Sequence, residues 1–128
     1  MKKYLGIDYG DKRVGLALAA EASIALPYKV LLNNNLEQLL ADLQKMIEQE
    51  NISLIVVGLP HSLSGNLNQR LAITQRFVDV LKVKIAIPVV TVDEQMSSKL
   101  YERQGVKKDI DKYAASAILD TYLTQHHV

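Results

Sequence analysis

Acidic residues stand at points of the chain where apolar segments end. Asp8 lies at the end of the apolar segment 4–9, and Asp93 and Glu94 directly follow the apolar run 85–92. A buried strand has little reason to end in acids unless water, a helix terminus or a cation takes up their charge. Open α/β sheets place ligands at the carboxyl ends of their strands, so these acids are candidates for a functional site. A helix N-cap or a surface salt bridge is the structural alternative for each of them.

A further acid, Asp111, lies on a helix face that is expected to point inward. This face consists of residues at steps of three and four: Asp111, Ala114, Ala115, Ile118 and Tyr122. It is apolar apart from Asp111, and its two alanines allow the helix to approach a sheet closely. Asp120 is roughly half a turn away in phase and is expected to face solvent. Stabilisation of the helix dipole is the structural alternative for Asp111.

Three inward carboxylates would repel one another unless a cation lay between them. Hard divalent ions such as Mg²⁺ take oxygen ligands and keep water molecules for a substrate phosphate. Two such ions about 4 Å apart can activate a water and stabilise the leaving oxygen in phosphodiester hydrolysis. We therefore expect Asp8, Glu94 and Asp111 to bind Mg²⁺ or Mn²⁺ directly, with Asp93 as a reserve ligand or as a residue behind the ligands. The chain has no cysteine and no cluster of histidines spaced for zinc.

Periodicity predicts the strands that position these acids. Segments 4–9 and 14–20 alternate with a period of two and are separated by a short turn, which indicates an antiparallel hairpin. Small residues occupy one face of the second strand, which leaves room there for a helix or a ligand. Segment 27–32 is expected to form an edge strand, where its proline is tolerated. The continuous apolar runs 52–59 and 85–92 are typical of strands buried on both faces.

Helical periodicity follows the third strand and recurs between the later ones. The expected helices are one capped by the asparagines at 33–35, one around 71–81, a short one from Ser97 to about 104, and a last one at 110–125 capped by Asp109. Strand–helix–strand crossovers require parallel pairing. We therefore predict an α/β fold with a mixed five-stranded sheet, in which three antiparallel strands gain two parallel additions and helices cover both faces. The chain is expected to form a single domain over residues 1–128.

Composition excludes several classes of protein. The sequence has 128 residues, 48% of them hydrophobic and 23% charged, which is typical of a globular domain. No apolar run approaches the roughly 20 residues of a membrane span, so we expect a cytoplasmic protein without a membrane partner. The formal net charge is +1, so nucleic-acid binding would require basic residues gathered on one face. Lys12 and Arg13 form one such group.

Several motifs together resemble one known family. Residues 7–17, which read IDYGDKRVGLA, closely resemble the opening motif of the YqgF family. Gly58, Leu59 and Pro60, followed by Gly65, look like its second motif, and Asp93-Glu94 resembles the start of its third. Residues 111–119, DKYAASAIL, resemble the fourth. The resemblance extends over essentially the whole chain, in the same order.

The family consists of resolvase-like proteins assigned as pre-16S ribosomal RNA nucleases. The resemblance implies an RNase H-like fold, a divalent-metal-dependent nuclease, and Asp8, Glu94 and Asp111 as its catalytic acids. It also implies that Lys12 and Arg13 lie beside the site and hold substrate phosphate; a solvated hairpin turn is the structural alternative. The implied substrate is the 5′ end of precursor 16S rRNA. RNA is favoured over a DNA junction, a ribosomal precursor particle is a further expected partner, and we expect a monomer or weak dimer.

The sequence departs from the family pattern in three places. Gln95 stands where the family usually has arginine, which removes a positive charge near the scissile phosphate. The second motif continues with His61 in an unusual loop, and the segment 103–109 is shorter than is typical. Three other functions compete with this one. An ATP-binding domain of the actin and sugar-kinase type would need a second lobe, which this length excludes. A nucleic-acid- or ribosome-associated binding protein without catalysis, and a Holliday-junction resolvase, stay open as alternatives.

Overall fold

The computed structural model describes residues 2–60, 68–93 and 110–126, with the backbone only at residue 68 and at 110–112. Its five strands are β1 (Lys3–Tyr9), β2 (Arg13–Ala20), β3 (Leu26–Leu32), β4 (Ile52–Leu59) and β5 (Val89–Asp93). The described helices are α1 (Leu36–Glu50), α2 (Asn68–Lys84) and α4 (Ile110–Gln125). None of these helices combines the length and apolar character needed to cross a membrane.

The strands form one sheet in the order β3-β2-β1-β4-β5. β1 pairs antiparallel with β2, and β2 pairs antiparallel with β3. β4 lies parallel to β1, and β5 lies parallel to β4. The carboxyl ends of β1, β4 and β5 therefore meet at one edge of the sheet. The predicted mixed sheet, with three antiparallel strands and two parallel additions, is confirmed.

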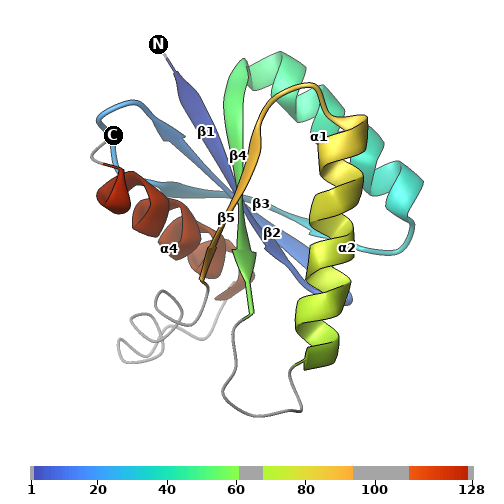
Figure 1. Cartoon of the computed structure of the whole chain (residues 1–128). Coiled ribbons are helices and arrows are strands. Elements are labelled where there is room, and N and C mark those ends of the chain that lie inside the picture. Colours follow the sequence, from blue (N-terminus) through green and yellow to red (C-terminus); the bar gives the residue numbers. More distant parts are fainter. Residues whose placement is uncertain (1, 61–67, 94–109, 127–128) are drawn as a thin grey trace.

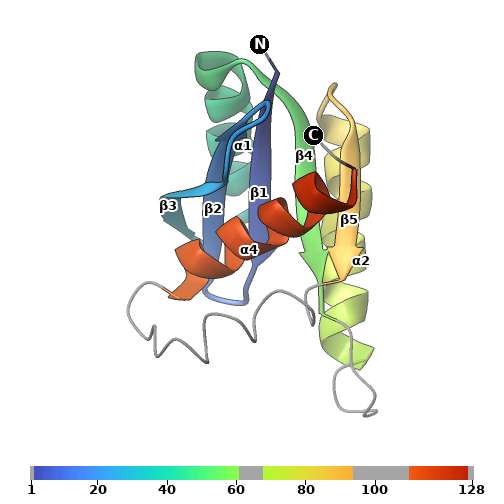
Figure 2. The ribbon, with the colours of Figure 1, turned by 90° about the vertical axis from the view of Figure 1, so that its left-hand side faces the viewer.

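Helices cover both faces of this sheet, as predicted. α1 and α2 lie on one face and α4 crosses the other (Figures 1 and 2). The α1/α2 face holds large apolar side chains, including Leu5, Ile7 and Leu16. The α4 face is built from smaller ones, including Ala17 and Ala19 of β2 and Ala115 of α4. Alternation along each strand thus divides the core into two layers of different side-chain size.

α4 packs closely against β1 at Gly6. A Cβ atom added to Gly6 would lie 2.8 Å from the Ala115 carbonyl oxygen and 2.9 Å from the Leu119 Cβ. Both distances are shorter than van der Waals contact, so only glycine allows this packing. At the far end of the same face, the ring centroids of Tyr4 and Tyr122 lie 6.4 Å apart. Burial raises the pKa of the Tyr4 phenol, and the charges of Glu21 and Tyr122 raise it further.

Replacing Gly6 with alanine should therefore destabilise the protein. The added methyl group must push α4 away from β1, and overpacking of this kind costs about 1–3 kcal/mol. Urea unfolding followed by circular dichroism should show a lower midpoint with an unchanged slope. An unchanged midpoint for Gly6→Ala would show that α4 can shift without cost and that the close contact is not a constraint.

Two details differ from the expectations, and the predicted asparagine cap of the first helix is confirmed. The predicted strand 85–92 begins only at Val89, because the Ile85 N–H closes α2 by donating to the Leu81 carbonyl at 2.8 Å. The first helix is capped by Asn35, whose side chain accepts from the Gln38 N–H. Asp120 does not face open solvent: its Oδ1 accepts a hydrogen bond from the Ala25 N–H at 2.8 Å. The β2–β3 loop packs against that side of α4.

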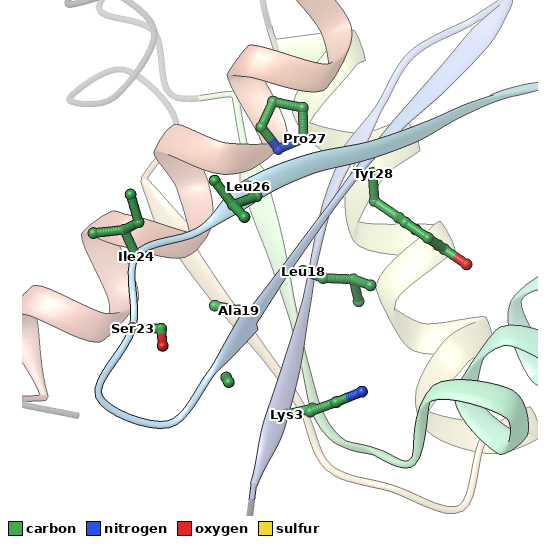
Figure 3. Close-up of a pocket in the computed structure, with 9 residues that line it drawn as sticks. Lys3, Leu18, Ala19, Ser23, Ile24, Leu26, Pro27 and Tyr28 are labelled. Atoms are coloured by element: carbon green, nitrogen blue, oxygen red, sulfur yellow. The ribbon is translucent and has the colours of Figure 1, made fainter.

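The structure also contains an open apolar groove of about 340 Å³ beside the β2–β3 loop. Lys3, Leu18, Ile24, Leu26 and Tyr28 are among the residues that line it (Figure 3). Lys3 begins β1 and Asp8 lies near its carboxyl end. The groove is therefore at the opposite end of β1 from the candidate site.

Candidate active site at the carboxyl end of β1

Asp8 occupies the sixth position of β1 and is half-buried. Tyr4 and Ala115 belong to the core layer on the α4 side, whereas Leu5 and Ile7 belong to the opposite layer. Since side chains alternate along a strand, Asp8 projects toward the α4 side. Its carboxylate therefore lies at the edge of the sheet where the three parallel strands end.

Glycines flank Asp8 in both neighbouring strands. Gly15 of β2 is its direct partner in the antiparallel pair. On the other side, Ile7 pairs with Val57, so continuing that register places Gly58 of β4 beside Asp8. Neither neighbour has a side chain that could cover the carboxylate.

The first turn of α4 begins at the same edge. Asp111 is the second residue of α4 and lies four residues, about 6 Å of helix, before Ala115. Asp8 lies two residues, about 7 Å of strand, beyond Gly6. Gly6 and Ala115 are in contact, and α4 starts near the end of the sheet where β1 ends (Figure 2). The backbone thus places Asp8 and Asp111 on the same side of that contact.

Asp93 lies on the other face of the sheet. Val92 belongs to the core layer on the α4 side, whereas Asp93 follows it and is paired with Leu59, which packs against the α1/α2 layer. Asp93 is therefore poorly placed as the reserve ligand beside Asp8. Glu94, Gln95, His61 and the segment 103–109 lie outside the described residues. Among the side chains that the structure does describe, no three carboxylates, histidines or cysteines converge.

The β1–β2 hairpin carries Lys12 and Arg13 at this edge. Both are exposed. Val14 belongs to the α1/α2 layer, so alternation puts Arg13 and Gly15 on the face that Asp8 shares. Arg13 is then the diagonal neighbour of Asp8 across the antiparallel pair, a separation of about 7–8 Å. The structure thus brings Asp8, Arg13 and the start of α4 to one edge.

Three contacts hold the turn of this hairpin in place. The Gly10 N–H donates to the Arg13 carbonyl at 3.0 Å, and the Asn33 N–H donates to the Lys12 carbonyl at 2.8 Å. The Asn33 side-chain amide also donates to the Gly10 carbonyl at 2.8 Å. Asn33 was expected to take part in helix capping, yet it braces the turn. Its role was missed because the sequence does not show that the end of β3 returns to this turn.

α2 contacts the hairpin from the other face. The Tyr9 ring stacks on Phe77 with ring centroids 3.9 Å apart, and the Tyr9 carbonyl accepts from Arg70 Nη2 at 2.8 Å. Arg70 Nη1 forms an ion pair with Asp11 in the turn. Arg70 escaped the sequence analysis because a lone arginine at the start of a helix is usually solvated. Its position seven residues before Phe77, two turns along one helix face, is the only signal that could have identified it.

Loss of the Asn33 side chain should loosen the hairpin. Asn33→Ala removes the donor to the Gly10 carbonyl, and a lost hydrogen bond of this kind costs about 0.5–1.5 kcal/mol. Hydrogen exchange of the Gly10 amide should become faster, as measured by NMR. Asn34→Ala is the matched control, since Asn34 is exposed and adjacent. Equal exchange in both variants would show that Asn33 does not brace the turn.

Comparison with known structures identifies the class of fold. The structure is similar to Thermus thermophilus RuvC, solved in complex with a Holliday junction substrate, with a TM-score of 0.65 over 97% of this chain and 96% of that one. The two sequences are 14% identical, so the likeness concerns the fold alone. The fold is RNase H-like, as the resemblance implied.

Sequence comparison then identifies the family. The family model described as "RuvX: Holliday junction resolvase" matches residues 2–125. A protein of Maridesulfovibrio salexigens is 36% identical, over 96% of this chain and 98% of its own length. A protein of Desulforudis audaxviator is 34% identical, over 94% and 93%. Both relatives are named "Putative pre-16S rRNA nuclease". The chain belongs to the RuvX/YqgF family.

Proposed function

We propose that this protein hydrolyses phosphodiester bonds of RNA with the help of divalent metal ions. The observation that carries the proposal is the placement of Asp8. Its half-buried carboxylate lies between two glycines, at the edge where the parallel strands end and α4 begins. Carboxylate oxygens at such an edge suit a divalent cation, which can bind a substrate phosphate at the same time.

The donor set fits a hard metal ion. Asp8 and Asp111 supply carboxylate oxygens, which Mg²⁺ and Mn²⁺ prefer, and Glu94 is the third proposed ligand. A bound ion would supply Lewis-acid activation of a water and of the scissile phosphate. Arg13 and Lys12 would hold the phosphate backbone next to the metal ligands. Charge-assisted hydrogen bonds from arginine to phosphate suit this task.

Precursor 16S rRNA is the substrate that we propose, with cleavage at its 5′ end. The names of the relatives support RNA, since both are named "Putative pre-16S rRNA nuclease". The match with this chain covers nearly the whole length of each relative. The family description names Holliday junctions instead. DNA junction cleavage is therefore the second candidate. Junction resolvases act as symmetric dimers with matched sites, and we expect this protein to be a monomer or weak dimer.

Asp8→Asn should abolish the cleavage. The purified protein is incubated with single-stranded RNA, a precursor-like rRNA and a four-way DNA junction, with Mg²⁺ or Mn²⁺ and separately with a chelator. The amide keeps the shape of the side chain and removes its charge. Mutation of a residue that hydrogen-bonds to a metal ligand typically costs about 10–100-fold, and loss of a ligand itself should reduce the rate by more than this.

Asp79→Asn is the matched control, since it removes an exposed carboxylate from α2 far along the chain from Asp8. Cleavage that survives both Asp8→Asn and the chelator would refute the metal site. Cleavage of the junction without cleavage of RNA would establish the resolvase function. Binding without cleavage of any substrate would establish a non-catalytic nucleic-acid-binding protein.

A further inference from the structure

The hairpin that is proposed to meet phosphate contains an acid. Asp11 lies in the turn directly before Lys12 and Arg13, and 69% of its side chain is exposed. A carboxylate at this point would repel a phosphate that approaches the two basic residues. Two negative groups a few ångströms apart interact unfavourably near a protein surface. The hairpin can attract nucleic acid effectively only if the charge of Asp11 is compensated.

Arg70 supplies that compensation from α2. Its Nη1 pairs with the Asp11 carboxylate, and its Nη2 donates to the Tyr9 carbonyl at 2.8 Å. The second hydrogen bond fixes the guanidinium against the end of β1, so the ion pair does not depend on a freely rotating side chain. The Arg70 side chain is only 29% exposed. The pair is therefore partly shielded from water on the arginine side.

The local structure of α2 keeps Arg70 in place. Its carbonyl accepts a hydrogen bond from the hydroxyl of the buried Thr74 at 2.9 Å. Two turns further along the same helix face, Phe77 stacks on Tyr9. α2 thus holds Tyr9 by its ring and, through Arg70, by its carbonyl. Arg70 is a preorganised part of the surface that carries the hairpin.

We infer that Arg70 is a positioning residue for nucleic-acid binding, which neutralises Asp11 so that Lys12 and Arg13 can engage a phosphate. This inference rests on the proposed function, because it assumes that the hairpin meets the nucleic-acid backbone. It assigns Arg70 an electrostatic role through Asp11. Arg70 is not assigned a contact with the phosphate itself.

The experiment measures binding without cleavage. A fluorescein-labelled single-stranded RNA is titrated with protein in the presence of chelator, and the dissociation constant is followed by anisotropy between about 50 and 200 mM salt. Arg70→Gln leaves Asp11 uncompensated and should weaken binding about threefold to tenfold at low salt. The effect should shrink as salt screens the exposed charge. Arg70→Lys keeps the charge and should bind nearly as tightly as the wild type.

The double variant Arg70→Gln/Asp11→Asn decides between neutralisation and direct contact. Because it removes the acid together with its partner, it should bind within about twofold of the wild type. Persistent weak binding of the double variant would overturn the inference and indicate that Arg70 touches phosphate itself. Arg76→Gln, an exposed arginine on the same helix, controls for net charge. If Arg76→Gln weakens binding as much as Arg70→Gln, the inference is also wrong.

Further measurements separate this inference from the proposed function. Urea unfolding checks that each variant is folded; if Arg70→Gln does not fold, the Arg70→Lys and double variants still give the comparison. If the wild type binds RNA but never cleaves it, the nuclease proposal fails while the pattern of variants still decides the role of Arg70. If the wild type binds neither RNA nor the DNA junction, both proposals fail. In an active protein, Arg70→Gln should raise KM and leave kcat within about twofold.

Discussion

The contact between α4 and β1 at Gly6 is the constraint on which the candidate site depends. The Ala115 carbonyl oxygen lies where a side chain of Gly6 would have to be. Because the helix is held at this distance, its first turn is placed one helical turn from the contact, and Asp8 is placed two strand residues from it. A bulkier residue at either position would separate the two acids. The packing of the core therefore sets the spacing on which shared metal binding would rest.

The two faces of the sheet differ in the size of the side chains that they carry. The α1/α2 face carries large apolar side chains such as Leu5 and Ile7, which bury most of the core. The α4 face carries alanines and Gly6, so the helix approaches the sheet closely there. The hairpin at the carboxyl end of β1 joins the two faces. Asp8 lies on one face of it, and Arg70 reaches it from the other.

Patterns within single elements predicted much of this arrangement. The alternation of β1 and β2, the apolar run of β4 and the helical spacing of the last helix were each visible locally. The inward orientation of the Asp111 side chain stays a prediction. Features that depend on distant segments were not visible. Arg70 and Asp11 are 59 residues apart, and Asn33 meets Gly10 only because β3 returns beside β2. Asp120 had the predicted phase, but the β2–β3 loop covers that side of its helix. Ile85 is apolar enough for a strand, yet it ends α2.

The ion pair of Asp11 with Arg70 shows how a turn next to the candidate site can tolerate an acid. Turns favour aspartate because its side chain satisfies local backbone groups, and a phosphate-binding turn excludes it because of its charge. A guanidinium that is fixed by the carbonyl of the preceding strand resolves this conflict without adding a net charge to the turn. Under the proposed function, Lys12 and Arg13 would then supply the positive charge that attracts the phosphate. If the hairpin binds nucleic acid as proposed, its affinity depends on α2 as well as on the hairpin's own sequence.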